Sequence, residues 1–271
     1  RSIYFVKVTD LDGKVDPDRL YWAETEPEQA REAKPPYDKV KKSGNVEGRF
    51  IYSSAVAKHL LPFRLLEPVP VVLPIVVKHG LISVREAKQL NDDGFRHFAE
   101  WMKDAEKIWQ EKREAKASKQ SLYERLDYQR ELSSQELSHR FLVLFNKSGT
   151  NVSAAVFDRT HHEIQFIVDY TLYWAPFSSE AEADYITAVA NSSAVNLAIK
   201  PFQSTGLLGE RDVTKKLLEL PIPTYNHEDK LHAALAEWGK TCAKMAGEAT
   251  NSGEFPIDAP LARQRAFVRT H

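Results

Sequence analysis

A change in amino-acid composition and pattern in the middle of the chain constrains the fold more than any other feature. From residue 83 to about residue 137 glycine almost disappears, and charges of both signs alternate. Apolar residues recur there at helical spacing, at Phe95, Phe98, Met102, Ala105 and Trp109. This pattern predicts a long helical hairpin whose apolar stripe packs on a neighbouring face. A coiled coil that binds a partner is the alternative interpretation of the same stripe.

The sequence on both sides of this segment is typical of β-structure. Before it, strands are predicted at residues 3–8, 49–52 and 69–77. After it, they are predicted at residues 140–146, 152–158 and 164–174. We therefore expect an α+β fold, in which a curved mixed β-sheet carries flanking helices and a long helical hairpin inserted at 83–137.

The C-terminal third contains the clearest local signals for helices. Ser179 and Glu182 form a capping-box pattern, and the apolar positions behind them predict a helix over residues 179–200. A second helix is predicted at about 227–246. The remaining residues are polar, with a last helix expected to begin near Pro260.

Composition narrows the class of protein. The chain has 271 residues, 42% of them hydrophobic and 28% charged, which fits an ordinary folded protein built as one elaborated domain or as one domain plus a helical insertion. The single cysteine, Cys242, excludes an internal disulfide and a multi-cysteine metal site, and fits a cytoplasmic protein. The longest apolar run, Val69 to Val77, is less than half of a membrane span. Because the chain opens at Arg1 without a signal-peptide pattern, we expect a cytoplasmic fragment of a longer protein, with no membrane contact.

The triplet Pro35-Pro36-Tyr37 is the first candidate for catalysis. A Pro-Pro-aromatic triplet preceded by Asn, Asp or Ser marks enzymes that methylate exocyclic amino groups of nucleic-acid bases. Here Lys34 precedes it, and no glycine-rich turn between a strand and a helix comes before it to hold a cofactor. We interpret the triplet as a turn stiffened by proline.

Other catalytic patterns are incomplete. His161-His162-Glu163 lacks the second histidine of a zinc-protease motif, since the position four after His162 is Phe166. Asp158 and Glu163 resemble a nuclease carboxylate pair, but a glutamine replaces the expected lysine. We predict no catalytic residue and no metal site in this chain.

Two stretches combine cations with amides, hydroxyls and glycines. The first contributes Lys39, Lys41, Lys42 and Arg49. The second contributes Lys200, Gln203, Ser204, Arg211, Lys215 and Lys216. Such mixtures suit contacts to phosphates and base edges of nucleic acid, with Gln203 able to pair with adenine and Arg211 with guanine. Solvated loops and helix caps are the alternative reading of both stretches.

The order of elements from residue 180 onward resembles a known module. The helix "EAEADYITAVANSSAVNLAIKPF" with its Asn191-Ser192 pair, the loop "QSTGLLGERDVTKK", the segment "LELPIP" and a further helix look like the end of a target-recognition domain. Such domains belong to type I restriction specificity subunits and to fused N6-adenine DNA methyltransferases.

The front of the chain resembles the same module. "PPYDKVKKSGNVEGRFIYS" followed by "LPFRLLEPVPVVLPIVV" is similar to its first half, so that the resemblance spans residues 35–240. Two departures stand out, because Gly48 replaces a frequent proline before Arg49 and the 83–137 insertion exceeds the simple module. On this basis residues 1–246 form one target-recognition-like domain, and residues 247–271 form a partly helical C-terminal tail.

The resemblance implies a function for the whole chain. It would recognise a sequence in double-stranded DNA, while a catalytic methyltransferase domain or subunit, N-terminal to this fragment, binds S-adenosylmethionine and flips out an adenine. No cofactor is expected in the fragment itself. The competing hypothesis is a protein-protein module whose hairpin docks a partner subunit, and a free-standing enzyme is the third.

Overall fold

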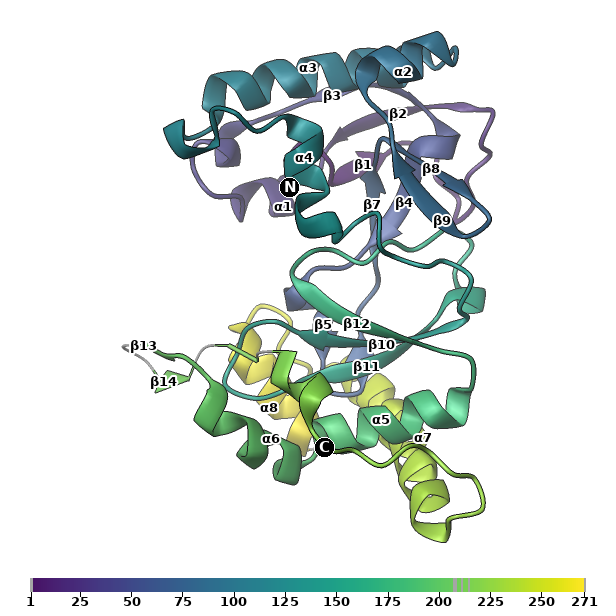
Figure 1. Cartoon of the computed structure of the whole chain (residues 1–271), viewed down its shortest axis with the longest axis vertical. Coiled ribbons are helices and arrows are strands. Elements are labelled where there is room, and N and C mark those ends of the chain that lie inside the picture. Colours follow the sequence, from purple (N-terminus) through teal and green to yellow (C-terminus); the bar gives the residue numbers. More distant parts are fainter. Residues whose placement is uncertain (1, 207–208, 211, 214, 271) are drawn as a thin grey trace. The chain divides into compact units, whose positions relative to one another are not determined.

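The structure, a computed structural model, describes residues 2–206, 209–210, 212–213 and 215–270, and divides into two compact units. Unit 1 comprises Arg1–Ser54, Pro68–Ser138 and His162–Ile167. Unit 2 comprises Ala55–Glu67, His139–His161 and Val168–His271. Figure 1 labels the elements of both units and colours the chain by residue number. The predicted domain of residues 1–246 therefore includes unit 1 and most of unit 2, and its boundary falls inside helix α7 (Lys230–Asn251).

Unit 1 begins with a three-stranded antiparallel sheet in the order β1-β2-β3. Its strands are β1 (Val6–Val8), β2 (Leu20–Thr25) and β3 (Ser43–Glu47). Burial alternates along β2, so that Tyr21 and Ala23 point into the core while Leu20 and Trp22 point outward. One face of this sheet is therefore a core surface and the other is open.

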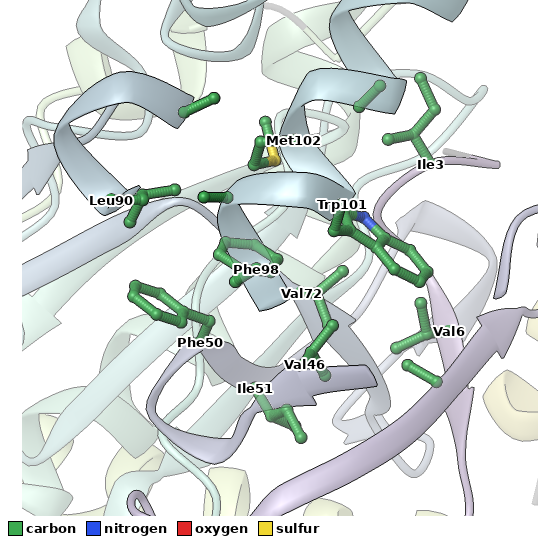
Figure 2. Packing of buried hydrophobic residues seen from close by; sticks show 14 of the residues in the cluster. Ile3, Val6, Val46, Phe50, Ile51, Val72, Leu90, Phe98, Trp101 and Met102 are labelled. Carbon is green, nitrogen blue, oxygen red and sulfur yellow. The ribbon is translucent and has the colours of Figure 1, made fainter. Parts of the chain in front are cut away.

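The inward face of the sheet is covered by helix α3 (Arg96–Lys112), which packs on β3. Its apolar stripe is buried, and Phe98 stacks on Phe50 with ring centroids 4.5 Å apart (Figure 2). The predicted long hairpin is wrong. The other helices of this segment, α2 (Ala87–Asp92) and α4 (Leu122–Leu126), are short, because strands rather than a second long helix cover the α3 stripe.

The rest of unit 1 consists of two antiparallel strand pairs and short helical turns. β4 (Ile51–Ser54) pairs with β7 (Val69–Val72), and β8 (Ile75–Lys78) pairs with β9 (Leu81–Val84). The predicted strand 69–77 is thus interrupted at Leu73-Pro74, where proline cannot donate a ladder hydrogen bond. The turns are α1 (Pro27–Arg31), η1 (Tyr37–Lys39), η2 (Gly48–Phe50), η4 (Ala115–Ala117) and η5 (Tyr128–Arg130).

Unit 2 is built on a second antiparallel sheet in the order β11-β10-β12. Its strands are β10 (Phe141–Asn146), β11 (Ala154–Asp158) and β12 (Leu172–Phe177), and a small hairpin joins β5 (Leu60–Leu61) to β6 (Arg64–Leu65). The predicted strand at 164–174 begins only at Leu172. All the named strand pairs are antiparallel, so that several small antiparallel sheets replace the predicted mixed sheet, while the α+β class is confirmed.

Helices cover the unit 2 sheet close to where the sequence predicts them. The predicted helix 179–200 is present as α5 (Glu180–Asn191) and α6 (Ser193–Ile199), which are separated by extended backbone at Ser192. α5 packs on the sheet, and α7 packs on α5 through small residues. At Gly239 the approach is so close that a Cβ atom would lie 2.3 Å from the main-chain oxygen of Asp184.

The last helix, α8 (Leu261–Thr270), is anchored within unit 2. Phe255, Leu261, Phe267 and Val268 join the apolar cluster around Leu61. The Arg265 guanidinium donates to the main-chain oxygens of Ala57 and Leu60, 2.9 and 3.1 Å away. The short elements of this unit are η3 (Ala57–His59), η6 (Arg159–His161), η7 (Lys200–Phe202), β13 (Thr205–Gly206), β14 (Gly209–Glu210) and η8 (Lys215–Glu219). Over the described ranges, the helices all lack the length and apolar character needed to cross a membrane.

Candidate nucleic-acid interface

The first cationic stretch lies in unit 1, between η1 and η2. Lys39 ends η1 and Lys41 follows it, and both are exposed. Lys42 points the other way. Lys42 is only 8% exposed. Its Nζ lies 2.9 Å from Asp104 Oδ2 and 4.5 Å from the centroid of the Trp101 ring. This ammonium is an internal anchor that ties the residue before β3 to α3, which speaks against the predicted DNA contact of Lys42; that contact stays a prediction.

Arg49 is exposed but held by its neighbours. Its guanidinium pairs with Asp18 and lies 4.7 Å from the Phe95 ring centroid. Gly48 precedes Arg49 at a tight turn, where a Cβ would stand 2.0 Å from the main-chain oxygen of Asp16. The close approach requires glycine, and it fixes the place from which the Arg49 side chain leaves the surface.

Tyr37 shows what the Pro-Pro-Tyr triplet does in this structure. The Pro35-Pro36 peptide bond is cis. The Tyr37 ring stacks on Trp109 with centroids 6.2 Å apart, and its main-chain oxygen accepts a hydrogen bond of 2.6 Å from Ser2 Oγ. Burial raises the pKa of the Tyr37 phenol. These contacts fit the interpretation of the triplet as a packed turn.

The second cationic stretch follows α6, whose position is set by the break between α5 and α6. The Asn191 side chain accepts from Ala154 N at 3.0 Å and donates to Ala154 O at 2.9 Å, which ties the end of α5 to strand β11. Ser192 Oγ accepts from Val195 N at 3.2 Å and caps α6. The Asn-Ser pair therefore ends one helix on the sheet and starts the next, which carries the chain to the exposed turn at Lys200.

Within this stretch, the predicted contact residues differ in their availability. Lys200 is exposed at the start of η7, Ser204 Oγ is hydrogen-bonded to Asp212, and Lys216 pairs with Glu219 and lies 5.3 Å from the Phe202 ring centroid. Arg211 lies outside the described residues, as does the side chain of Lys215.

Gln203 requires a correction. It is 8% exposed, and its Nε2 donates to the main-chain oxygens of Gly149 and Thr150 at 3.2 and 3.3 Å. These hydrogen bonds speak against the predicted pairing of Gln203 with adenine, because the amide hydrogens are already used inside the protein; the pairing stays a prediction. The same hydrogen bonds hold the turn that exposes Lys200 and Phe202 against the loop after β10.

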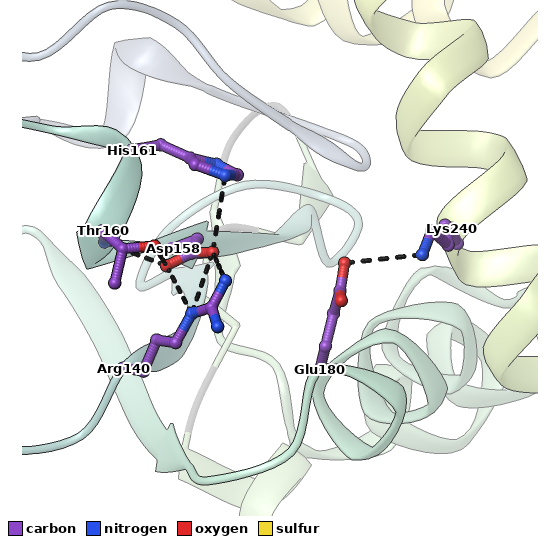
Figure 3. A network of polar contacts seen from close by, with 6 residues as sticks. All are labelled: Arg140, Asp158, Thr160, His161, Glu180 and Lys240. Carbon is purple, nitrogen blue, oxygen red and sulfur yellow. Dashed lines mark hydrogen bonds and ion pairs between the residues drawn. The ribbon is translucent and has the colours of Figure 1, made fainter.

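Asp158 and Glu163, the candidate carboxylate pair, each have a cationic partner. Arg140 binds Asp158 through two nitrogens, with its Nη2 2.8 Å from Asp158 Oδ2, and Thr160 donates to the same carboxylate (Figure 3). These donors hold the pKa of Asp158 well below its usual range. Glu163 pairs instead with Lys14 at 3.2 Å. Across the part of the chain that the structure describes, no group of three His, Cys, Asp or Glu residues is placed to hold a metal ion.

Two apolar surfaces were missed by the sequence reasoning. On β2, Leu20 and Trp22 are 44% and 47% exposed; the alternation of "LYWAET" is the signal that predicts an outward row there. On α7, exposed apolar residues recur every seven positions, at Leu231, Trp238 and Met245. A groove of about 370 Å³ adjoins the start of α7, with a lining that includes Tyr185, Val195, Ile222, Pro223, Leu231 and Leu235.

Comparison with known proteins adds no family to this description. No protein-family model matches the sequence, and no curated protein matches it.

Proposed function

We propose that this chain is the sequence-specific DNA target-recognition fragment of an adenine-specific DNA methyltransferase or restriction-modification protein. The catalytic domain would lie N-terminal to it, bind S-adenosylmethionine and flip the target adenine out of the helix. This chain would hold the DNA and choose its sequence. No residue of the chain is assigned to hold the cofactor, and none is assigned to the reaction.

The observation that carries the proposal is the construction of the loop after α6. Asn191 fixes α5 to the sheet, Ser192 restarts the chain as α6, and the Tyr185 hydroxyl donates to Pro223 O at 3.0 Å, which pins the Leu-Pro-Ile-Pro segment to α5. A scaffold that fastens both ends of a cationic loop suits contacts to nucleic acid, because the loop can vary while its base stays fixed.

The residues proposed to contact DNA are those whose side chains are exposed to solvent. Lys39, Lys41 and Lys200 reach solvent and would neutralise phosphates, and Arg49 has an exposed guanidinium edge beside its pair with Asp18. Ser204 and Lys216 already have internal partners, so they would contribute only by exchanging them. Lys215 and Arg211 stay predictions from the sequence, and the contact expected of Arg211 is with guanine.

The test is the salt dependence of binding to duplex DNA by the full chain. Binding should weaken steeply between low and physiological salt, and the triple variant Lys39→Ala/Lys41→Ala/Lys200→Ala should reduce the salt slope by roughly two to three. Lys88→Ala, an exposed lysine on α2, is the matched control and should leave the slope unchanged. Equal slopes for the triple variant and the native chain would refute the assignment of these lysines, and a chain without duplex affinity would refute the function.

A second candidate function, docking of a partner helix, is favoured by the exposed row on α7. The hairpin that the sequence offered for this role is absent, and the α3 stripe is buried in unit 1. Leu231 and Trp238 are each 62% exposed, and Met245 is 44% exposed, at the spacing of one edge of a coiled coil. The catalytic domain or subunit of the parent protein is the partner that fits this proposal.

Docking on α7 is tested by association with the N-terminal part of the parent chain. Trp238→Ala should weaken association, measured by calorimetry, by tenfold or more, because exposed aromatic anchors dominate such interfaces. Ile257→Ala, which removes an apolar side chain that is 69% exposed outside α7, is the control. Unchanged association for both variants would remove this candidate.

A further inference from the structure

The open face of the β1-β2-β3 sheet carries an aromatic side chain at its centre. β2 is the middle strand, and its outward residues are Leu20, Trp22 and Glu24. Tyr21 and Ala23, between them, are buried in the core of unit 1. The Trp22 indole is therefore mounted on a strand whose backbone is fixed on both sides, while 47% of the residue remains exposed. When a flat ligand stacks on this tryptophan, no further cost arises from ordering the backbone that carries it.

The strand register gives this tryptophan polar neighbours. Asn45 on β3 lies directly opposite Trp22, and on the other side Thr9 N donates to Trp22 O at 2.9 Å. Asn45 is exposed, so its amide can donate and accept beside the indole. An aromatic plane next to a free carboxamide is the combination that recognises a heterocyclic base by its face and its edge.

Charge on this face points to a base rather than to phosphate. Lys7 on β1 lies opposite Glu24 on β2, and Ser43 on β3 lies on the other side of Glu24. Lys7 and Glu24 therefore offset each other beside Trp22 and Asn45, which add no charge. Glu47, opposite Leu20, has its carboxylate engaged by the main-chain N–H groups of His97 and Phe98 at the start of α3. The exposed Lys41 stands two residues before Ser43, at the margin of the sheet, where it could meet a phosphate.

From this arrangement we infer that the open face of β1-β2-β3 is a stacking platform for one unpaired nucleobase, with Trp22 beneath its ring and Asn45 at its edge. A paired base inside a duplex has both faces covered, so the ligand is a base in a single strand, a bulge or an opened base pair. The inference rests on the proposed function, because an enzyme that flips a base leaves unstacked nucleotides in its DNA. It adds a site in unit 1 to the contacts proposed for duplex phosphates.

The test compares two probes on the full chain: single-stranded oligothymidine and a fully paired duplex. Trp22→Ala should lower affinity for the single strand by roughly 5- to 100-fold, the effect of losing one base–aromatic stack, and leave duplex affinity within about twofold. Trp22→Phe, which keeps a ring, should restore most of the affinity. Asn45→Ala should narrow the difference in affinity between oligothymidine and oligodeoxyadenosine, because the edge contact is lost.

Tyr128→Ala is the matched control, since Tyr128 is an aromatic residue of unit 1 that is 50% exposed on η5. The platform is overturned if Trp22→Ala binds the single strand as tightly as the native chain, or if Tyr128→Ala loses as much affinity. It is also overturned if Trp22→Ala changes only self-association in sedimentation, which would make the face a protein contact. If the native chain binds duplex DNA in a salt-dependent way, the proposed function stands even when the platform is overturned. If the native chain does not bind duplex DNA, the proposed function is refuted, and the single-strand measurements still test the platform.

Discussion

The two cationic stretches have similar compositions but are built into the protein in different ways. In unit 1, Lys41 and Lys42 are neighbours in sequence, yet Lys41 is exposed and Lys42 is an anchor that contacts Trp101 and Asp104. In unit 2 the anchors are the neutral amides of Asn191 and Gln203, and Lys200 is exposed. The difference shows that a count of cations overestimates the contacts available to a nucleic acid, because some side chains of each stretch hold it in place.

The largest effect is expected from the tightest point of the first stretch. Gly48→Ala places a methyl group against a backbone oxygen that cannot move as a side chain can, and should lower the free energy of unfolding by about 3 kcal/mol or more. Gly253→Ala, where the added carbon meets nothing within 4 Å, should change it by less than about 0.5 kcal/mol. Urea-induced unfolding followed by circular dichroism distinguishes the two. Similar costs would mean that the turn before Arg49 is not constrained as described.

The anchor of the second stretch is tested by Asn191→Ala. This change leaves the buried main-chain N–H of Ala154 without its side-chain acceptor, while Ala154 O keeps the hydrogen bond from Phe63 N at 2.7 Å, and it should cost about 2 to 3 kcal/mol. Ser192→Ala removes only the cap of α6 and should cost about 1 kcal/mol. The ratio of the two losses in urea unfolding is the readout. A larger cost for Ser192→Ala would shift the anchor from the sheet to the helix cap.

Lys41 and Lys42 can be separated by matched substitutions. Lys42→Met keeps the aliphatic stem but removes the ammonium above Trp101, and should reduce the free energy of unfolding by about 1 kcal/mol without altering the salt slope of DNA binding. Lys41→Met should do the opposite, with unchanged stability and a slope lower by about one. If Lys42→Met changed the slope instead, the distinction between anchor and contact would fail.

A smaller effect is expected from pH, through a carboxyl group in the scaffold of unit 2. Burial, followed by the nearby charge of Glu180, raises the pKa of Asp184 in α5 from 3.8 to about 6, although Lys240 opposes the shift. The stabilising contribution of the protonated carboxyl is complete below pH 3.8 and is lost as the pH rises through about 6.

Asp184→Asn should remove that loss, which we place on the order of 1 kcal/mol because solvent screens the group in part. Unfolding free energies at a series of pH values from 4 to 8 give the measurement. Asp158, whose pKa is held low by Arg140, keeps its charge throughout this range and should not contribute to the change. A native chain whose pH profile matches that of Asp184→Asn would contradict the burial of this carboxyl.

Local signals predicted the helices of unit 2 well. Ser179 accepts a hydrogen bond from Glu182 N at 3.4 Å, as the capping pattern requires, and the last helix begins at Leu261. The strands around β10 were also predicted, since their apolar runs are bounded by turn residues. Patterns that operate within one element are readable from the sequence because the physical causes lie within a few residues of one another.

Long-range relations were not readable in this way. The apolar stripe of α3 predicts that another element packs on it, but the pattern does not distinguish a helix from a sheet. In the structure the covering element is a sheet. Gln203 carries the same donors whether it faces solvent or the loop at Gly149. The orientation of Lys42 depends on its register beside β2, where Thr25 N donates to Lys42 O at 2.7 Å. Each outcome is fixed by residues far away in sequence, which a local pattern does not contain.

The hydrogen bond from Tyr185 to Pro223 has a further consequence for how this protein can change. It joins residues 38 positions apart and so holds the two ends of the intervening segment together. For a flexible loop whose ends are already fixed, doubling the length costs only about 0.6 kcal/mol of closure entropy. Gln203 and Val213 are both buried, so a change in the length of the chain between them would cost little in folding while α5 and its sheet remain as they are. Under the proposed function, such changes would be a route to new DNA specificities.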